Sequence, residues 1–268
     1  MRQTSRNSYR LLMMLRLLLK LGPGKALHSL RGMWPYCQDF QALKVQELSS
    51  AKVFPFGKLY PCLEERFLES GSASGHYFHQ DLLTARRVFA NNPVTHVDVG
   101  SRIDGFVAHV ASFRRIEVFD IRPLSNTIPN IRFRQADLMA PINEELESYC
   151  DSVSCLHALE HFGLGRYSDP VNYDGYLLGL SNLWKILKKG GKLYISVPIG
   201  PQRIEFNAHR VFSVSFLLEC FSGKYALDQF SFVDDQGDLH ENVTIRNQDL
   251  NNNFNCSYGC GIFEMTKI

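Results

Sequence analysis

The feature that most constrains the fold is a turn of small residues directly after a short apolar segment. Residues 95–99 are the apolar segment, Gly100 opens the sequence Gly-Ser-Arg-Ile-Asp-Gly, and a second apolar segment at 116–119 ends at Asp120. Short apolar runs of this kind are typical of strands buried in a parallel sheet. Because such a turn lets backbone amides approach a ligand, and an acid about 20 residues further on can bind ribose hydroxyls, we predict a nucleotide-like cofactor site here.

The turn departs from the fingerprint of dinucleotide-binding proteins. Arg102 stands where the pattern G-x-G-x-x-G places its second glycine, the residue that lets the backbone approach a pyrophosphate. We therefore expect a ligand without phosphates. Residues 106–113, between the two predicted strands, are expected to form a helix.

Strands and helices alternate along the rest of this region. The further elements predicted are strands at 130–137, 151–156 and 192–198, and a helix at 176–187 with leucines at the spacing of one buried face. This alternation implies right-handed crossovers and an open, mostly parallel α/β sheet that binds ligands beyond the carboxyl ends of its strands. The polar residues expected to gather along that edge are Asp98, Asp120, Asp137 and His157.

Several of these segments together resemble the class I S-adenosylmethionine-dependent methyltransferases. The glycine turn, the acids that close strands two and three, Leu-Glu-His at 159–161 and the stretch 187–198 occur in the order found in that superfamily. The resemblance covers residues 75–268 and implies a mostly parallel, seven-stranded Rossmann-like sheet with helices on both faces. It also implies a closing antiparallel pair at 229–233 and 261–266. Because the turn is reduced to Gly-Ser-Arg-Ile-Asp-Gly, the chain looks closest to an uncharacterised methyltransferase-like subgroup of bacteria and nematodes.

The resemblance implies that S-adenosylmethionine is the cofactor. In the superfamily the glycine turn holds the methionine part, the acid after strand two holds the ribose, and the acid after strand three reaches the adenine amine. The implied cofactor-binding residues are Asp98, Gly100, Ser101, Arg102, Asp120, Ile121, Asp137, Leu138 and His157. A helix predicted through 82–89 is preceded by Tyr77 and Gln80, which are candidates for the cofactor carboxylate. Asp81 is either a third candidate or the helix N-cap.

Three histidines are candidates for the general base. Methyl transfer to a hydroxyl needs close positioning of the reactants and removal of the hydroxyl proton, and histidine suits that task near neutral pH. His157 directly follows the fourth predicted strand, and His161 lies one turn later, where a purely structural role is the alternative. His209 lies after the fifth strand, where the superfamily's acceptor-facing loop runs. Glu160 is expected either to tune a histidine or to bind substrate hydroxyls.

The loop at 162–175 is long, glycine-rich and charged, as functional loops often are. Arg166 is a candidate to clamp a phosphate or carboxylate of the substrate, and Tyr167 a candidate to stack on a sugar ring. The alternative is an ordered surface lid in which Arg166 pairs with Asp169 or Asp174.

The N-terminal part differs from the catalytic region in character. Residues 1–25 hold six basic residues and no acidic one, and as a helix they would carry leucines on the opposite flank. The apolar run at 11–21 is too short to cross about 30 Å of hydrocarbon, so we expect a basic amphipathic helix that either lies on a membrane surface or docks on protein. Residues 26–74 are predicted to be an irregular, aromatic-rich extension that packs over the sheet or the mouth of the site.

Composition fits one large α/β core with an extension, since 45% of the 268 residues are hydrophobic. The seven cysteines are odd in number and include no C-x-x-C pair, which favours a reducing compartment. Cys256 and Cys260 lie outside common zinc spacings and lack a histidine nearby in the sequence, so no metal is expected.

No basic patch interleaved with aromatic residues marks the core, which argues against a nucleic-acid substrate. The expected location is the cytoplasm, either free or at the inner face of a membrane.

Two functions from different classes follow from this sequence. The first is a methyltransferase acting on a small or sugar-like acceptor, as in surface-glycan assembly. The second is a non-catalytic cofactor-binding or scaffolding protein with the same fold. A nicotinamide-dependent short-chain oxidoreductase is disfavoured because the chain has no Tyr-x-x-x-Lys pair.

Overall fold

The computed structural model describes residues 23–51 and 54–268. The chain divides into two compact units, Met1–Ser72 and Ala73–Ile268. The amphipathic helix predicted for residues 1–25 lies outside the described residues up to position 22. Among the described residues, no helix is both long enough and apolar enough to span a membrane.

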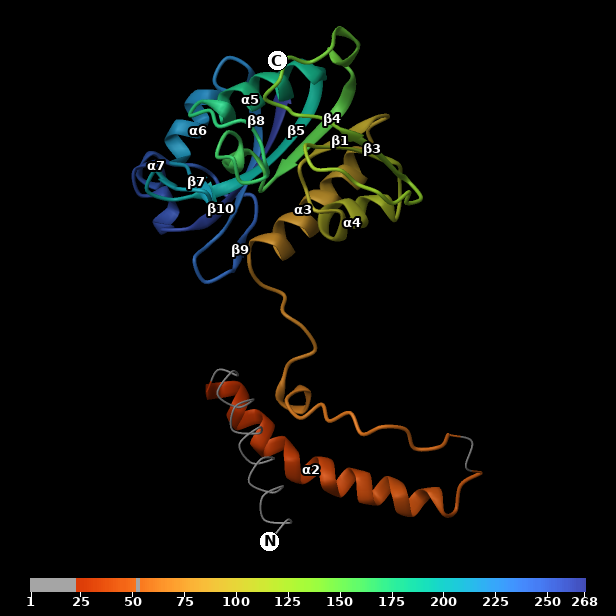
Figure 1. The fold of residues 1–268 in the computed structure, drawn as a ribbon. Helices are drawn as coiled ribbons and strands as arrows, with labels where there is room; N and C mark the ends of the chain where they lie inside the picture. The colour runs from red at the N-terminus through yellow and green to blue at the C-terminus, as the bar shows by residue number, and fades with distance from the viewer. Residues whose placement is uncertain (1–22, 52–53) are drawn as a thin grey trace. The chain divides into compact units, whose positions relative to one another are not determined.

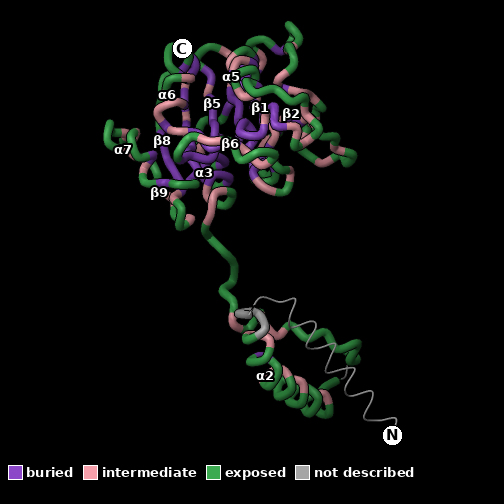
Figure 2. The backbone as a smooth tube through the Cα atoms, turned by 60° about the vertical axis from the view of Figure 1, so that its left-hand side comes forward, coloured by how far each residue is buried: buried purple, intermediate pink, exposed green. Residues whose placement is uncertain are grey.

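In the first unit, the described residues form one long helix, α2 (Pro23–Glu47), and a one-turn helix, η1 (Glu65–Phe67). The expectation of irregular structure from residue 26 onward is therefore wrong for its first half. Pro35 lies inside α2 and removes only one backbone donor, while the leucines, glutamines and lysines around it favour a helix. Most of α2 is exposed (Figure 2), and Ser29 donates a 2.8 Å hydrogen bond to Glu64.

The second unit is built on an eight-stranded sheet in the order β3-β2-β1-β4-β5-β10-β8-β9 (Figure 1). The pairs from β3 to β5 are parallel, and the pairs from β5 onward are antiparallel. This confirms the predicted mostly parallel sheet with a closing antiparallel strand, to which the two-residue strand β9 adds an edge. The strands of the sheet are β1 (His96–Val99), β2 (Ile116–Asp120), β3 (Ile131–Gln135), β4 (Cys150–Leu156), β5 (Leu187–Ile199), β8 (Tyr225–Val233), β9 (Leu239–His240) and β10 (Gly259–Lys267). A separate hairpin pairs β6 (Arg203–Glu205) with β7 (His209–Val211).

Helices cover both faces of this sheet (Figure 1). Residues of α3 (His76–Asn91), η2 (Ile103–Val107) and α4 (Ala108–Ala111) pack on Ile116 and Val118 of β2. Residues of α5 (Gly175–Ile186) and α6 (Val214–Phe221) pack on the other face. The short elements that remain are η3 (Glu144–Leu146), η4 (Leu159–His161), α7 (Asn247–Asn252) and η5 (Asn253–Asn255).

Two elements differ from the sequence prediction. The helix predicted at 106–113 is confirmed as far as Ala111, where α4 ends, and it is preceded by a non-helical backbone at Gly105 inside η2. The helix predicted at 176–187 is observed as α5, but the strand predicted to begin at Lys192 begins at Leu187, which pairs with Cys150 before the register shifts.

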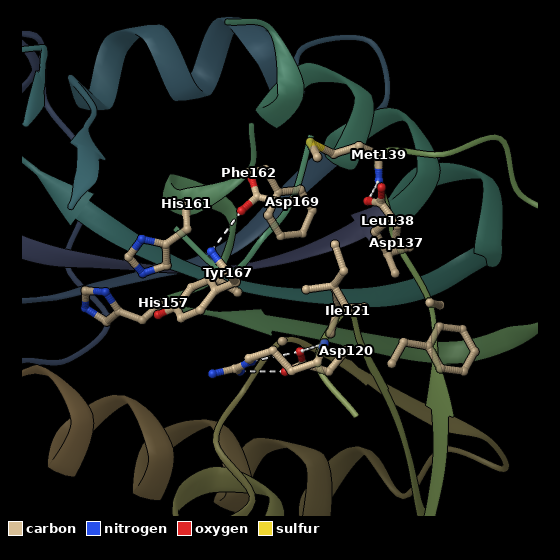
Figure 3. A pocket seen from close by; sticks show the side chains of 16 residues that line it. Asp120, Ile121, Asp137, Leu138, Met139, His157, His161, Phe162, Tyr167 and Asp169 are labelled. Carbon is tan, nitrogen blue, oxygen red and sulfur yellow. Dashed lines mark hydrogen bonds and ion pairs between the residues drawn. The ribbon is translucent and has the colours of Figure 1, made fainter. Parts of the chain in front are cut away.

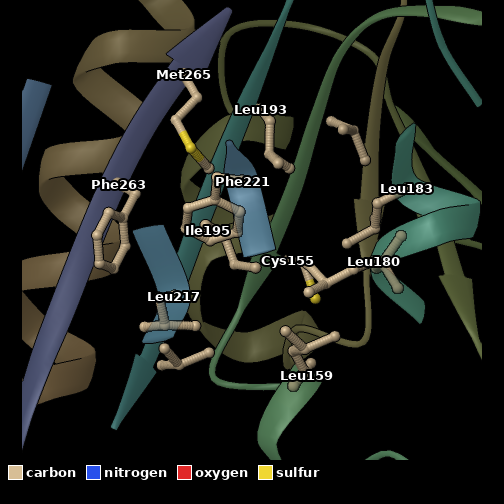
Figure 4. Close-up of a cluster of buried hydrophobic side chains, with 14 of the residues drawn as sticks. Cys155, Leu159, Leu180, Leu183, Leu193, Ile195, Leu217, Phe221, Phe263 and Met265 are labelled. Atoms are coloured by element: carbon tan, nitrogen blue, oxygen red, sulfur yellow. The ribbon is translucent and has the colours of Figure 1, made fainter. Parts of the chain in front are cut away.

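The larger core lies between the sheet and helices α5 and α6 (Figure 4). Leu183 of α5 and Ile195 of β5 are fully buried, as is Phe263 of β10. Burying one such side chain stabilises the fold by roughly 1.5–3 kcal/mol. A core of this extent fixes the strand ends and the loops that follow them.

Candidate functional site

The turn after β1 brings the backbone against the end of β4. Gly100 has φ +77°, and its amide donates a 2.9 Å hydrogen bond to the carbonyl of Phe119. A Cβ at this position would lie 2.8 Å from the Cβ of Ala158, closer than two methyl groups can approach. Glycine is therefore required here both by conformation and by space.

The buried side chain of Asp98 stabilises this turn through hydrogen bonds. Its carboxylate is fully buried and accepts hydrogen bonds from the amide and the hydroxyl of Ser101 and from the hydroxyl of Ser154, at 3.1, 2.8 and 2.6 Å. Burial raises the pKa of Asp98 to about 7. Asp98 was predicted to bind the cofactor, but its side chain lines neither of the two cavities described below. It instead positions the turn, whose residues Gly100 and Ser101 line those cavities.

A cavity lies beyond the carboxyl ends of β1, β2, β3 and β4 (Figure 3). The predicted residues that line it are Gly100, Asp120, Ile121, Asp137, Leu138, His157, His161 and Tyr167. The folding of parallel strands thus brings together side chains from four separate loops.

Asp120 is held in place by Arg122, a residue that the sequence reasoning missed. The Arg122 amide and Nε donate to Oδ1 of Asp120 at 2.8 and 2.9 Å, and its Nη2 donates to Oδ2 at 2.6 Å. The guanidinium of Arg122 also lies over the ring of Tyr167, 4.5 Å from its centroid. A ribose hydroxyl at Asp120 would therefore share the carboxylate with Arg122.

Asp137 follows β3 on the neighbouring loop. Its Oδ1 accepts a 2.8 Å hydrogen bond from the amide of Met139, which holds the carboxylate in a tight turn. The side chain lines the cavity beside Leu138 (Figure 3). A carboxylate in this position can accept a hydrogen bond from an exocyclic amine.

Two histidines, His157 and His161, also line the cavity (Figure 3), and Glu160, which is buried, lies close to both. Oε1 of Glu160 is 2.7 Å from Nδ1 of His157 and 3.6 Å from Nε2 of His161. Nδ1 of His161 donates a 2.7 Å hydrogen bond to the carbonyl of Ala208, which fixes the lone pair on Nε2. Nε2 of His157 lies 3.2 Å from Nδ1 of His76. Both nitrogens of His157 are thus within hydrogen-bond distance of a partner, whereas only Nδ1 of His161 makes a hydrogen bond.

Burial and charge shift the pKa values of this group in opposite directions. Burial lowers the pKa of His161, and it lowers that of His76 to about 4. Burial alone would raise the pKa of Glu160, but its contact with His157 outweighs burial and lowers it. Burial also opposes charge on His157, yet Cys260 and Glu160 raise the pKa of His157 well above its usual range. Glu160 is therefore a carboxylate that stabilises positive charge on the histidines.

A second cavity lies beside Ser101 of the glycine turn. Of the residues predicted for the cofactor, Tyr77, Gln80, Asp81, Ser101 and Arg102 line it. The alternative role of Asp81 as a helix N-cap is wrong, because α3 begins at His76 and its N-cap is Gly75. The Gln80 side chain is buried, donating to Asp81 and accepting a 2.5 Å hydrogen bond from Ser196. Arg102 is exposed and pairs with Asp104.

Besides Asp98, three predicted residues lie outside both cavities. Glu160 faces the histidines rather than the open space. Arg166 donates a 2.8 Å hydrogen bond to the carbonyl of Ala208, not to Asp169 or Asp174 as the alternative expected. His209 has its Nε2 3.2 Å from Glu205 in the β6–β7 hairpin.

Asp169 and Arg210 hold the loop after β4. Asp169 accepts hydrogen bonds from the amides of Gly163, Gly165 and Tyr167, at 2.9 to 3.1 Å. Arg210 is buried and donates to the carbonyls of Phe162 and Tyr173, at 2.6 and 2.9 Å. The loop that carries Tyr167 is therefore ordered from both sides. Nothing in the local sequence marks Arg210, which lies far from this loop in the chain.

The strand order and the cavities at the carboxyl ends of β1–β4 define the fold of the class I S-adenosylmethionine-dependent methyltransferases. Residues 127–258 match the family described as "Caenorhabditis protein of unknown function, DUF268", which agrees with the predicted nematode resemblance. A search of curated proteins gave no significant match.

Among solved structures, the chain is similar to the [4+2]-cyclase SpnF, at 12% identity, 70% and 80% coverage of this chain and that one, and a TM-score of 0.50. It also matches the 1,6-didemethyltoxoflavin-N1-methyltransferase of Burkholderia thailandensis (15% identity, 70% and 78% coverage, TM-score 0.49). A third match is the N-methyltransferase NodS of Bradyrhizobium japonicum (11% identity, 72% and 88% coverage, TM-score 0.47). At 12% identity the likeness to SpnF shows the fold alone.

Proposed function

We propose that this chain is an S-adenosylmethionine-dependent methyltransferase acting on a small or sugar-like acceptor. The observation that carries the proposal is that Gly100, Asp120 and Asp137 line one cavity at adjacent strand ends. Asp120 is suited to bind the ribose, and Asp137 the adenine amine. The second cavity, lined by Tyr77 and Gln80, is suited to the methionine part.

The residues present fit such a cofactor. The bend at Gly100 leaves no room for a Cβ beside Ala158, so the two cavities adjoin a bare backbone turn. Gln80 and Ser101 offer uncharged hydrogen-bonding groups to an amino-acid moiety. When bound, S-adenosylmethionine supplies an electrophilic methyl group.

His161 is the best placed general base of the three predicted histidines. Its Nδ1 donates to the carbonyl of Ala208, so its Nε2 has the lone pair that can accept a proton. The carboxylate of Glu160, 3.6 Å from this nitrogen, stabilises the imidazolium that forms. His157 is a weaker candidate because Glu160 and His76 engage both of its nitrogens. His209 does not line the cavity.

The acceptor is proposed to enter beside Tyr167. Its ring lies 5.4 Å from that of His161 at nearly a right angle, and the loop that carries it is held by Asp169 and Arg210. An aromatic face beside a histidine suits a sugar ring or another small hydroxyl compound. Arg166 lies outside the cavity and donates to the carbonyl of Ala208, so we do not assign it to substrate binding.

Calorimetric titration with S-adenosylmethionine and its demethylated product tests the proposal. Asp120→Asn should weaken binding by roughly tenfold or more, because a hydrogen bond to a charged group contributes about 1.5–3 kcal/mol. Glu145→Gln is the matched control, since Glu145 also pairs with an arginine, Arg134, but lies outside both cavities. Failure of the wild-type chain to bind would refute the proposal. Binding without transfer to any hydroxyl acceptor would favour the non-catalytic alternative.

A further inference from the structure

Two histidines and one cysteine, far apart in the sequence, converge beside the first cavity. His76 begins α3, His157 follows β4, and Cys260 lies on β10. One possible ligand atom from each of the three side chains lies within 4.8 Å of the others. The spacing of these residues along the chain gave no sign of this cluster.

The geometry of the cluster is close to that of a zinc site. Tetrahedral zinc has bonds of about 2.0–2.1 Å to nitrogen and 2.3 Å to sulfur, which places its ligand atoms roughly 3.3–3.8 Å apart. Nε2 of His157 and Nδ1 of His76 are already 3.2 Å apart. The sulfur of Cys260 lies within 4.8 Å of a nitrogen of each ring, so a modest approach of the sulfur would complete the set.

The surroundings of His157 are those of a metal-binding histidine. Glu160 is buried, and its Oε1 is 2.7 Å from Nδ1 of His157, so the carboxylate orients the ring with Nε2 toward the cluster. Oε2 of Glu160 has no hydrogen-bond partner. A carboxylate on the remote ring nitrogen is the usual outer partner of a histidine that binds zinc.

The backbone also fixes this ring. His157 has φ +49°, an unfavourable conformation for a residue with a side chain. Its amide donates to the carbonyl and to the hydroxyl of Ser196, at 2.9 and 3.2 Å. Strain of this kind persists where the surrounding structure holds a functional side chain in place.

We propose that His76, His157 and Cys260 bind a single transition-metal ion, Zn²⁺ by the chemistry of the set, with Glu160 as the outer carboxylate. The ion would take the place of the proton between the two imidazoles. Nitrogen and thiolate ligands select zinc over magnesium or calcium, and three protein ligands leave a fourth position for water or an acceptor hydroxyl. The site does not rest on the proposed function. If both hold, His157 is committed to the metal, and His161 remains the base.

Cobalt titration of the full chain, first stripped of metal with a chelator, tests the site. Co²⁺ in this set should give a thiolate-to-metal absorption band that saturates at one ion per chain and disappears when Zn²⁺ is added. Cys260→Ser should abolish the band, and His76→Ala should weaken binding at least tenfold. Glu160→Gln should weaken it roughly 10–100-fold, as loss of an outer partner does.

Cys256→Ser is the matched control, because Cys256 is also buried and lies four residues earlier on the same segment. It should retain the band and the affinity of the wild type. Absence of the band in the wild type, or its loss in Cys256→Ser but not in Cys260→Ser, would overturn the proposal. Circular dichroism of each variant confirms that it is folded. Calorimetry with S-adenosylmethionine on the same preparations separates failure of the metal site from failure of the cofactor site.

Discussion

Replacing Gly100 with alanine tests the reason for glycine in the turn after β1. Two costs are expected at this position. At φ +77°, a residue with a Cβ costs roughly 1–2 kcal/mol. The added methyl would also lie 2.8 Å from the Cβ of Ala158, and overpacking of this kind costs about 1–3 kcal/mol. Gly100→Ala should therefore lower the free energy of unfolding by about 2–5 kcal/mol.

Gly190 offers a matched control. It also has φ +77°, but a Cβ there would meet nothing within 4 Å. Gly190→Ala should therefore show only the conformational cost, about 1–2 kcal/mol. The difference between the two variants isolates the contact with Ala158. Urea denaturation followed by circular dichroism measures both free energies, and calorimetry should show weakened S-adenosylmethionine binding in Gly100→Ala alone.

A double-mutant cycle refines the test. In Gly100→Ala/Ala158→Gly the close contact is gone, so the cycle should give a coupling energy of about 1–3 kcal/mol in favour of the double variant. Equal losses in Gly100→Ala and Gly190→Ala, together with no coupling to Ala158, would refute the steric part of the reasoning. They would leave φ as the whole cause.

Two further changes probe the parts that hold the site. Burial raises the pKa of Asp98 from 3.8 to about 7, so between these pH values Asp98 is protonated in the folded state and ionised in the unfolded state. The wild type should therefore lose up to about 4 kcal/mol of stability relative to Asp98→Asn as pH rises from about 4 to 7. Urea denaturation across that range measures the difference, and parallel pH profiles would contradict it. Arg210→Leu should lower stability by about 1–3 kcal/mol, because buried carbonyls of Phe162 and Tyr173 lose their donor. Arg210→Leu should also make the loop at 162–174 sensitive to limited proteolysis. Arg166→Leu, which changes an exposed arginine, should not have this effect. Equal cleavage in both variants would argue against the role of Arg210.

The sequence was most informative where order along the chain determines position in space. In a parallel sheet every strand ends at the same edge, so the residues that follow neighbouring strands must lie close together. That rule brought Asp120 and Asp137 to one cavity before any coordinates were needed. A separate rule predicted the strands themselves: continuous apolar runs are typical of strands that are buried on both faces of a parallel sheet.

The same rule could not say where a side chain turns. Asp98 and Glu160 both follow or end strands at the correct edge, but Asp98 is bound by Ser101 and Ser154, and Glu160 by histidines. Such partners are decided by burial, because a buried carboxylate must find donors within the protein. Arg122 was within reach of sequence reasoning, since a residue two positions after an acid at a turn can bind that acid.

Contacts between distant segments were beyond local patterns. Arg210 binds the loop after β4 from the β6–β7 hairpin, and Cys260 reaches His76 from the last strand. No periodicity connects positions 76, 157 and 260. These three residues meet because β10 lies between β5 and β8 in the sheet. This position brings Cys260, at the amino end of β10, close to residues far from it in the chain.

Glu160 connects the two proposals through one oxygen. Oε1 is 2.7 Å from His157 and 3.6 Å from His161, so any positive charge on His157 reduces the attraction left for a proton on His161. A metal ion at His157 would act in the same direction as the proton it replaces, because both place positive charge beside this carboxylate. Any coupling between the proposed metal and the proposed base would thus pass through this carboxylate rather than through direct contact.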